Sequence, residues 1–537
     1  MSEVNCSFDS VEPMRDVSPL LLSKLPKKTS ILPVKGFTLP LLQPSLAWEC
    51  NFLTMAFLGA FLAILSESHR SYVYGLLGVI AFDATVYYNR KSTMAGAPYT
   101  FPFVALASMI LDPVRFWSEQ THLAVNSEEG MSSNTLIGTF VVLVTDTKLC
   151  QEILAADGIV RGLPHPDARW LLGSRHSMNL DDDEAYKTFR CLLTPLLLTY
   201  DAPWMTQGLV DVCRDQLNRI CVTGKTSNKA MDVRIAFGSL TSSVSQELFL
   251  GPHINDAFRG ELDSDIHTLV NGFIWFPFPF LNNRLARTIH AKTRILRQLM
   301  TIIPNVRSYL DTGKEPRCLL EHWVSVINSV SKDKAHPQFK VSSYTDLDVV
   351  TSVLAFMIAV QNNFTSSLTY SIDILATRPD VVSRIRIEII DVGVNNLLTM
   401  IQDPAKLTYT RKVSTQILQH RPPVAMIPCL TKQATTLGKH SIPKGTIVIV
   451  ADRTSLPFNP DSEIVDTKIT KTTTFGGGNH QCPVSRFAES MLTLFLAVLV
   501  DGYDFERVGS RPSVEDVMYC YSTVFPLKND FLFTRRS

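Results

Sequence analysis

The sequence predicts a mainly α-helical protein with small β-sheets. Residues 205–249 and 289–312 have the periodicity of amphipathic helices, and residues 346–377 form a longer helical pattern that is apolar on all sides around residues 355–359. Residues 139–144 are rich in β-branched side chains and alternate weakly, which predicts a strand. Thirty prolines interrupt the chain, so we expect many loops between the helices.

Composition excludes some classes of protein. The 537 residues carry a formal net charge of +1, which gives no reason to expect a nucleic-acid partner. Hydrophobic residues make up 45% and charged residues 19%, as in a packed globule with a membrane-leaning character. The ten cysteines show no CxxC pair and no regular spacing. This argues for a reducing compartment and against both a disulfide framework and a structural zinc site.

The N-terminal region predicts attachment to a membrane. Residues 1–51 are polar and interrupted by prolines, which predicts a flexible tail. Two apolar stretches follow at 52–65 and 71–88; the first is short for a bilayer span, and the second is about long enough but contains Asp83. We expect a membrane anchor over residues 52–91, formed by one or two apolar segments. A buried hydrophobic helix followed by a strand is the alternative.

The second apolar stretch has flanks typical of a membrane segment. Tyrosines cluster at both of its ends, as they do at membrane surfaces. Arg90 and Lys91 follow directly and would hold that end of the segment in the cytosol.

A glycine-rich bend, one cysteine and a helix start lie together in residues 475–489. The three consecutive glycines permit positive φ angles and close approach to a bulky planar group. Cys482 stands at the mouth of an apolar helix, where the helix dipole and free N–H groups favour a thiolate. His480 lies two residues before Cys482, so its side chain can reach the edge of a group bound by the Cys482 sulfur. Taken alone, such a cysteine is more often an ordinary buried thiol.

This stretch resembles the haem-binding loop of the cytochrome P450 family, whose pattern is Phe-x-x-Gly-x-His/Arg-x-Cys-x-Gly-x-x-x-Ala. The matching positions are Phe475, Gly478, His480, Cys482 and Ala488. The resemblance implies a P450-like haem-thiolate fold in which Cys482 is the axial ligand of the iron of haem b, and a thiolate ligand favours O–O cleavage. It implies that His480 hydrogen-bonds a haem propionate and that Phe475 and Gly478 belong to the haem site.

Two further positions near the haem follow from the resemblance. Val484 stands where the family has a glycine, and we expect its β-branched side chain to strain the turn or crowd the porphyrin. Arg190 fits a family arginine that pairs with a haem propionate. It lies on a helix that begins with the acidic residues 181–184, and an ordinary surface arginine is the alternative.

Residues 361–367 resemble the oxygen-binding helix of the family in position and in their Thr-Ser-Ser ending. Family members carry an acid and an alcohol here to relay protons. Asn362 aligns with the acid and Phe364 with the alcohol, and neither can relay a proton by ionising or through a hydroxyl. The resemblance places Asn362 and Thr365 on the oxygen side, where Thr365 could replace the alcohol after a small shift. Proton delivery through bound water is the alternative.

A third block resembles the family's Glu-x-x-Arg helix, which is closely followed by Pro-Pro. Gln416 and Gln419 replace the charged pair. Two glutamines can hydrogen-bond each other without a net charge to bury, so we expect this brace to survive in weaker form. Between residues 450 and 475 the family meander is shortened and its arginine motif is missing; only Arg453 and residues 459–461 remain.

The resemblance covers residues 71–537 and implies a proline-containing hinge at 92–103 and a haem-thiolate catalytic domain over 104–537. It looks closest to fungal sterol C-22 desaturase-like members. The leading prediction is a monooxygenase that hydroxylates, epoxidises or desaturates a lipophilic sterol-like, terpenoid or polyketide molecule of fungal secondary metabolism. The implied partners are the lipid bilayer and an NADPH-cytochrome reductase that supplies electrons. The implied location is the endoplasmic reticulum membrane, with the catalytic domain in the cytosol.

The departures from the family pattern leave two other hypotheses open. The chain could keep the fold and the haem but catalyse a redox-neutral cyclisation, isomerisation or dehydration, with the pocket supplying the catalysis. It could also be a degenerate, non-catalytic member or the product of a faulty gene model. Substrate contacts are expected around residues 95–117 and 273–280.

Overall fold

The structure is a computed structural model of the whole chain. It describes residues 67–91, 94–96, 102–136, 138–156, 159–161, 203–227, 230–271, 283–332, 345–392, 406–451, 458–461, 473–511, 517–520 and 523–536. The chain divides into two compact units, Met1–Tyr74 and Gly75–Ser537. The predicted tail and the first apolar stretch lie outside the described residues.

Helices make up most of the described chain, as predicted. They are α2 (Glu67–Lys91), α3 (Pro102–Leu111), α4 (Pro113–Val125), α5 (Thr147–Ala155), α8 (Pro203–Ser227), α9 (Val233–Leu250), η3 (Gly251–His253), α10 (Asp256–Asn271), α11 (Asn283–Asp311), α12 (Leu319–Lys332), α13 (Asp346–Leu375), α14 (Pro379–Val392), α16 (Thr408–His420), η8 (Gly478–His480) and α18 (Ser485–Gly502). The helical pattern at 205–249 is two helices, because Asp232 begins α9 by accepting the N–H of Arg234 at 2.9 Å.

The described strands form small sheets, which confirms the predicted fold class. The largest sheet has the order β1 (Met131–Leu136), β2 (Thr139–Val144), β8 (Ile447–Val450), β5 (Ile427–Thr431) and β3 (Ile159–Arg161). Strands β2 and β8 are parallel, and the other neighbours in this sheet are antiparallel. A second sheet joins β4 (Met231–Asp232), β12 (Asp530–Arg535) and β9 (Tyr503–Arg507). Two hairpins pair β6 (Thr435–Leu437) with β7 (His440–Ile442) and β10 (Val517–Cys520) with β11 (Thr523–Pro526).

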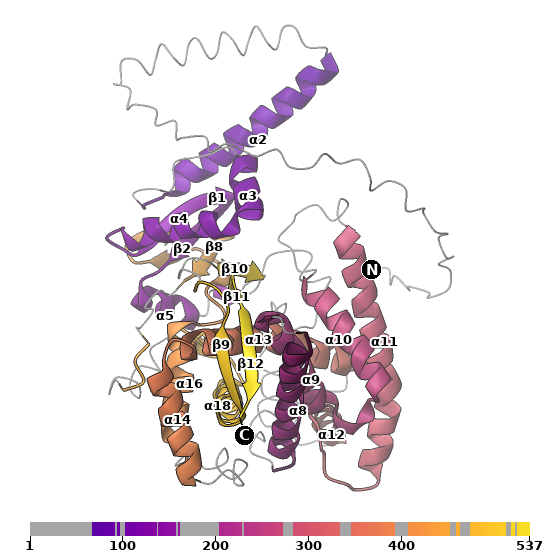
Figure 1. The fold of residues 1–537 in the computed structure, drawn as a ribbon. Coiled ribbons are helices and arrows are strands. Elements are labelled where there is room, and N and C mark those ends of the chain that lie inside the picture. The colour runs from indigo at the N-terminus through magenta and orange to yellow at the C-terminus, as the bar shows by residue number, and fades with distance from the viewer. Residues whose placement is uncertain are drawn as a thin grey trace, which may run out of the picture. The chain divides into compact units, whose positions relative to one another are not determined.

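Helix α13 is the central buried helix. Its first turn has a capping box: the Thr345 hydroxyl accepts the N–H of Asp348 at 3.3 Å, and the Asp348 carboxylate accepts the N–H of Thr345 at 2.8 Å. Every residue from Phe364 to Leu375 is buried. The helix packs against α9, α11, α16, α18 and β11, and Figure 1 shows it among the helices and strands of the second unit. This agrees with the helix predicted at 346–377.

Of the helices in the described ranges, α13 alone is long and apolar enough to cross a membrane. Half of its most apolar window is buried inside the protein, which is typical of a core helix. The membrane anchor predicted for residues 52–91 therefore stays a prediction.

The second apolar stretch lies in α2, and its later part packs on the β1–β2 hairpin. Asp83 is completely buried, and its carboxylate accepts the Thr135 hydroxyl at 2.8 Å and the Gly138 N–H. Tyr87 is buried on the same side, whereas the neighbouring Phe82 is 63% exposed. Asp83 thus lies inside the protein, hydrogen-bonded to the β1–β2 hairpin, while Phe82 and Tyr88 of the same helix are exposed.

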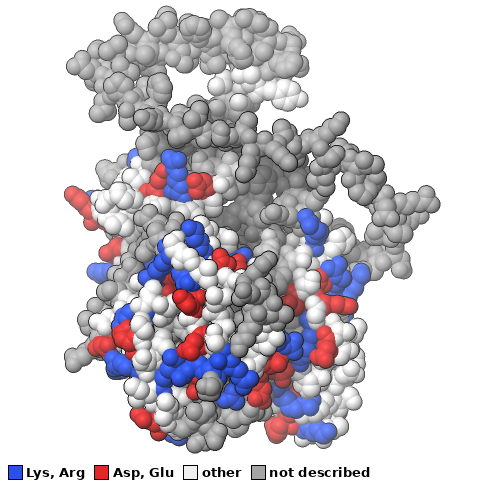
Figure 2. Space-filling view, in the orientation of Figure 1, with Lys and Arg blue, Asp and Glu red and all other residues white. Residues whose placement is uncertain are grey.

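Charges of both signs are mixed over the visible surface. Figure 2 shows Lys and Arg side chains interspersed with Asp and Glu over the described part of that face. This distribution matches the nearly balanced numbers of 51 basic and 50 acidic residues. Electrostatic attraction to a strongly charged polymer is therefore weak on the face that is seen.

Candidate haem-thiolate site

The cysteine loop is a tight turn held by its own backbone. The N–H of Gly476 donates to the carbonyl of Thr473 at 2.8 Å, and the N–H of Cys482 donates to the carbonyl of Phe475 at 2.8 Å. Gly476 and Gly478 have φ angles of 76° and 59°, in the left-handed region that favours glycine. The glycine-rich stretch therefore supplies the positive φ angles that its sequence predicts.

The C-terminal end of helix α5 packs against this loop. A Cβ on Gly478 would lie 2.3 Å from the carbonyl oxygen of Leu154 and 3.0 Å from the Cα of Ala155, and one on Gly477 would lie 3.3 Å from the Leu154 Cβ. The loop and the end of α5 are thus in backbone contact. This contact fixes the loop that carries Cys482.

Cys482 is less buried than five other cysteines of the protein. Cys482 is half-buried, whereas five other cysteines are buried: Cys150, Cys213, Cys221, Cys318 and Cys429. Burial raises the pKa of the Cys213 and Cys318 thiols to about 12, so both are protonated at neutral pH. Of these groups, Cys482 is the one placed to hold a ligand outside the core.

The residues of the loop fit a haem. Cys482 is half-buried, and α18 begins at Ser485, three residues after it, so the sulfur lies near the N-terminal end of that helix. His480 and Phe475 are both half-buried beside it. Helix α18 then buries ten consecutive residues, Met491 to Val500, which holds the loop on a rigid element.

Val484 does not strain the turn, which corrects one expectation. Its φ is −111°, which any L-residue adopts, and it is the N-cap residue of α18. Its carbonyl accepts the N–H of Ala488 at 2.8 Å. The β-branched side chain is therefore compatible with the backbone, and crowding of the porphyrin stays a prediction.

Thr365 lies on the side of α13 that faces α9. Its hydroxyl is 3.0 Å from the Thr241 hydroxyl of α9 and donates to the carbonyl of Gln361 at 2.5 Å. Gln361 lies on the same side and donates to the Gly238 carbonyl at 2.8 Å. The role predicted for Thr365 as a proton-relay alcohol requires this hydroxyl to leave α9, and that role stays a prediction.

A different face of α13 meets strand β11. The Asn363 side-chain carbonyl accepts the Thr523 hydroxyl at 2.9 Å, and the Ser366 hydroxyl donates to the Val524 carbonyl at 2.6 Å. Val524 in turn donates its N–H to the Pro423 carbonyl at 3.0 Å. The sequence analysis did not single out this connection, because nothing in the local pattern of 523–526 indicates its partner.

Asn362 is half-buried on α13. Phe364, which aligns with the family alcohol, is 8% exposed and belongs to the main hydrophobic core. An aromatic side chain in that core has no hydroxyl with which to relay protons. The departure from the acid-alcohol pattern is therefore present in the fold as well as in the sequence.

The two glutamines of α16 form the predicted uncharged brace. Both are buried, and the Gln416 side-chain amide donates to the Gln419 side-chain oxygen at 3.3 Å. The N–H of Asn459 donates to the Gln416 side-chain oxygen at 3.1 Å. Gln419 Nε2 is buried and has no hydrogen-bond partner within the described ranges. The brace thus reaches the shortened meander through a backbone N–H, where the family pattern uses an arginine.

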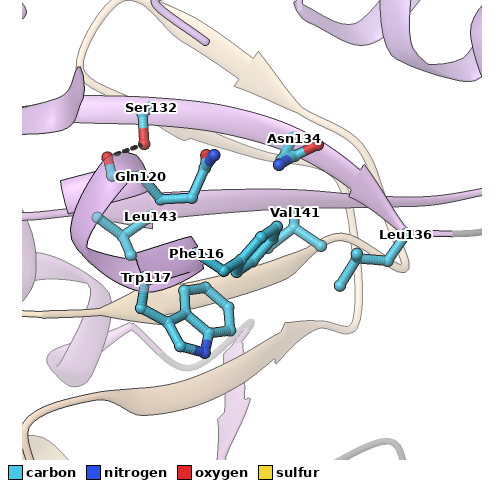
Figure 3. A pocket seen from close by; sticks show the side chains of 8 residues that line it. All are labelled: Phe116, Trp117, Gln120, Ser132, Asn134, Leu136, Val141 and Leu143. Atoms are coloured by element: carbon cyan, nitrogen blue, oxygen red, sulfur yellow. Dashed lines mark hydrogen bonds between the residues drawn. The ribbon is translucent and has the colours of Figure 1, made fainter. Parts of the chain in front are cut away.

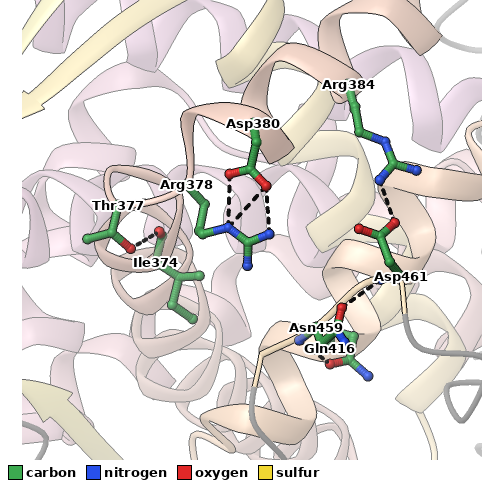
Figure 4. A network of polar contacts seen from close by, with 8 residues as sticks. All are labelled: Ile374, Thr377, Arg378, Asp380, Arg384, Gln416, Asn459 and Asp461. Atoms are coloured by element: carbon green, nitrogen blue, oxygen red, sulfur yellow. Dashed lines mark hydrogen bonds and ion pairs between the residues drawn. The ribbon is translucent and has the colours of Figure 1, made fainter.

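Polar contacts extend this brace to α14, as Figure 4 shows. The N–H of Asp461 donates to the Asn459 side-chain oxygen at 3.2 Å, and Asp461 forms an ion pair with Arg384 of α14. Beside it, Arg378 forms hydrogen bonds to Asp380 and lowers the pKa of that carboxyl to about 2. The sequence had pointed to residues 459–461 without showing where they bind.

Glu489 is a partly buried acid on the first half of α18. Burial raises its pKa, and the positive charges of Arg411 and Arg486 partly oppose this effect. The Glu489 carboxyl lies on the helix that follows the cysteine loop, so its protonation state changes the charge of that helix. The sequence analysis did not single it out.

A small recess lies between α4 and the β1–β2 hairpin. Figure 3 shows its lining side chains: Phe116, Trp117, Gln120, Ser132, Asn134, Leu136, Val141 and Leu143. Its empty space is about 230 Å³, including the part open to solvent, which is smaller than the roughly 300–1,000 Å³ of typical ligand pockets. The recess is too small for a lipophilic substrate. The predicted contacts at 95–117 stay predictions, and Arg190 and residues 273–280 lie outside the described ranges.

A mainly helical fold with a glycine-rich cysteine loop at the start of a buried helix defines the haem-thiolate class. The family model for cytochrome P450 matches residues 129–452, which is more than half of the chain. The chain therefore belongs to the cytochrome P450 family and is a haem-thiolate monooxygenase by class. The matched range ends before the cysteine loop, so the assignment of Cys482 rests on the loop itself.

Curated relatives are similar over most of their length. Cytochrome P450 710A2 of Arabidopsis thaliana is 27% identical over 477 residues, covering 83% of this chain and 92% of that protein. C-22 sterol desaturase ERG5B of Gibberella zeae is 24% identical over 496 residues, covering 85% and 90%. C-22 sterol desaturase erg5 of Aspergillus fumigatus is 23% identical over 561 residues, covering 98% and 100%.

Solved structures share the fold. A cyanobacterial CYP120A1 bound to retinoic acid has a TM-score of 0.66 at 16% identity and covers 82% of this chain and 99% of that chain. A zebrafish cytochrome P450 with progesterone has a TM-score of 0.64 at 19% identity and covers 78% and 99%. These similarities confirm the P450 fold predicted from the cysteine loop and the central helix.

Proposed function

We propose that this chain oxidises a lipophilic, sterol-like small molecule by hydroxylation, epoxidation or desaturation. The observation that carries the proposal is the similarity to C-22 sterol desaturases, one of which aligns over 98% of this chain and its own full length. A terpenoid or polyketide of fungal secondary metabolism belongs to the same range of apolar substrates.

In this proposal, the cysteine loop holds the haem. Cys482 would ligate the iron, Phe475 and Gly478 would belong to the haem site, and His480 would bind a propionate. Arg190, outside the described residues, binds the other propionate. When bound, the haem supplies the activation of molecular oxygen. The helix dipole of α18 favours the thiolate form of the sulfur, because the loop lies at the N-terminal end of that helix.

The other side of the haem belongs to α13 in this proposal. Asn362 positions water by hydrogen bonds, since its amide both donates and accepts but does not ionise. Thr365 reaches that water only if its hydroxyl leaves Thr241. Thr523 of β11 donates to Asn363, and Ser366 donates to Val524 of β11; these bonds keep β11 against α13, so in this proposal the hairpin that carries β11 forms a wall of the substrate pocket.

The proposed setting is the membrane of the endoplasmic reticulum, with the catalytic domain in the cytosol. Residues 52–91 attach the chain to the bilayer, which also concentrates an apolar substrate. Electrons come from NADPH through an NADPH-cytochrome reductase.

The first experiment tests the haem site. Purified protein is reduced, exposed to carbon monoxide, and its spectrum compared with that of Cys482→Ala and of the control Cys213→Ala. A thiolate-type band that disappears only in Cys482→Ala is the expected result. Purified protein without bound haem would leave only a degenerate, non-catalytic chain.

A redox-neutral reaction is the second candidate, and Phe364 is the observation that favours it, because a core aromatic residue stands where the family alcohol aligns. Consumption of NADPH and oxygen is measured with a reductase and a panel of sterols, terpenoids and polyketides. Consumption that depends on the substrate supports the oxidation proposal. Product formation without consumption of either would favour the redox-neutral reaction instead.

A further inference from the structure

Three side chains with metal-binding atoms meet far from the cysteine loop in sequence. A ring nitrogen of His253, the Sγ of Cys318 and a carboxylate oxygen of Glu321 all lie within 4.8 Å of one another. Cys318 and Glu321 are completely buried, and the His253 side chain is 8% exposed. Nitrogen, thiolate and carboxylate are the three ligand types that zinc takes in proteins.

The fold brings these residues together for identifiable reasons. Gly251 ends α9 with a φ of 54°, and a Cβ at this position would lie 3.0 Å from the Cβ of Cys318. The glycine thus lets η3, which carries His253, pack directly on the start of α12. Cys318 and Glu321 are three residues apart at that start, so they share one face of the helix.

Without a metal, Glu321 is held by hydrogen bonds from cationic or polar groups. His253 Nε2 lies 2.6 Å from its carboxylate, and Arg317 donates to it from the guanidinium at 2.9 Å and also from its backbone N–H. The carboxylate is therefore already directed at the histidine, inside a part of the fold where it is completely buried.

Arg317 is the group that competes with a metal cation. Its side chain is 43% exposed, and its guanidinium stacks on the Tyr309 ring at 3.7 Å. An arginine at the surface can turn to solvent, whereas the three candidate ligands cannot. One Zn²⁺, one thiolate and one carboxylate form a neutral group, which removes the need for the buried carboxylate to have a cationic partner.

We propose that His253, Cys318 and Glu321 form a zinc site. Zinc replaces the hydrogen bond between His253 and Glu321. The proton on Nε2 is lost to solvent while Nδ1 carries the ring proton of the neutral imidazole, which frees the Nε2 lone pair for the metal. The thiol proton of Cys318 is also displaced to solvent. A water molecule completes a tetrahedral set, as in other sites with three protein ligands. The site joins the end of α9 to the start of α12 and is independent of the reaction at Cys482.

The test uses the full-length, haem-loaded protein, stripped of metal with a chelator and titrated with zinc in competition with a chromophoric indicator. We expect one zinc per chain, with binding at least tenfold weaker in His253→Gln and in Cys318→Ser. His440→Gln and Cys429→Ser are matched controls and should bind zinc as the wild type does. His440 forms a pair with Glu129 that is similar to the His253–Glu321 pair, and Cys429 is another buried thiol.

A third variant keeps the test informative if a ligand variant fails to fold. Arg317→Gln retains all three ligands and removes the competing charge, so zinc should bind severalfold more tightly. Zinc should also raise the unfolding temperature of the wild type and of Arg317→Gln. Equal zinc affinity in all five variants, or no zinc bound by the wild type at micromolar concentrations, would overturn the proposal.

Discussion

Gly478 occupies a position that no residue with a side chain can take without moving α5. Its φ is 59°, and its missing Cβ leaves room for the carbonyl of Leu154. Two independent requirements, backbone conformation and space, therefore select glycine four residues before Cys482. The placement of the proposed iron ligand depends on both.

Replacing Gly478 with alanine should disturb the cysteine loop. We expect a loss of about 1–3 kcal/mol in stability and weaker retention of haem, measured from urea unfolding and from the carbon-monoxide spectrum. Gly313→Ala is the matched control, because Gly313 has a φ of 73° but no neighbouring atom of the described chain within 4 Å of the position that a Cβ would take. Equal effects of both variants would show that backbone strain alone, and not the contact with α5, is responsible.

The raised pKa of Glu489 predicts a dependence of stability on pH. The folded protein holds this proton more tightly than the unfolded chain, whose carboxyl titrates near 4.5. Its contribution to stability is therefore present below pH 4.5 and is lost as the pH rises through the raised value. Glu489→Gln should be more stable than the wild type at pH 7, and this advantage should disappear near pH 4.5 in urea unfolding experiments.

Glu388→Gln is the control for that measurement and should have the opposite sign. The Glu388 carboxylate accepts the N–H groups of Tyr409 and Thr410 at 2.7 and 2.9 Å, at the start of α16. A neutral amide accepts these bonds less strongly, so stability should fall at pH 7. If Glu489→Gln also lowers stability at pH 7, its burial is not the dominant effect.

At the scale of the element, uncharged hydrogen-bonding groups join α16 to the meander. Gln419→Arg places a cation at a site that is 6% exposed and whose described hydrogen-bond partner is an uncharged glutamine, so we expect a loss of about 3 kcal/mol. Adding Gln416→Glu supplies the anion and should recover most of that loss, as seen in the urea midpoint and the rate of haem release. A double variant no more stable than Gln419→Arg would show that the two positions do not form a pair.

Elements were predictable where the signal is local. The α13 helix follows from an apolar run whose period is that of a helix, and the Gln416–Gln419 bond follows from their spacing of three residues. The direction of the Thr365 hydroxyl was not predictable, because the packing of α9 sets how α13 is rotated about its axis. The strain expected at Val484 is absent, because the turn holds this residue at a φ of −111° and not in the left-handed region that favours glycine.

At the scale of the whole molecule, contacts between residues far apart in the chain could not be predicted from the sequence. Asp83 looked like a charge that interrupts a membrane span, and its partners Thr135 and Gly138 lie about fifty residues later in the chain. No residue close to Asp83 in the sequence indicates that Thr135 and Gly138 are its partners. The same holds for the zinc ligands, since His253 is brought to Cys318 by the packing of α9 on α12 and not by a short motif.

The Asp83 contact predicts how the later part of α2, which belongs to the second unit, is held on the β1–β2 hairpin. Asp83→Ala leaves the Gly138 N–H and the Thr135 hydroxyl without this acceptor, which should cost about 1–3 kcal/mol. Trypsin should then cleave faster at Arg90 and Lys91. Tyr88→Ser is the control, because Tyr88 is 64% exposed. Unchanged cleavage in Asp83→Ala would mean that the rest of α2 holds the helix in place.

The parallel pairing of β2 with β8 joins two strands from distant parts of the sequence, with Val141 opposite Ile447. During synthesis, the early strand emerges from the ribosome long before its neighbour exists. The edge of β2 that pairs with β8 stays unpaired until β8, at residues Ile447–Val450 of 537, has been made. Slow maturation and a need for folding assistance in the host are therefore built into the topology.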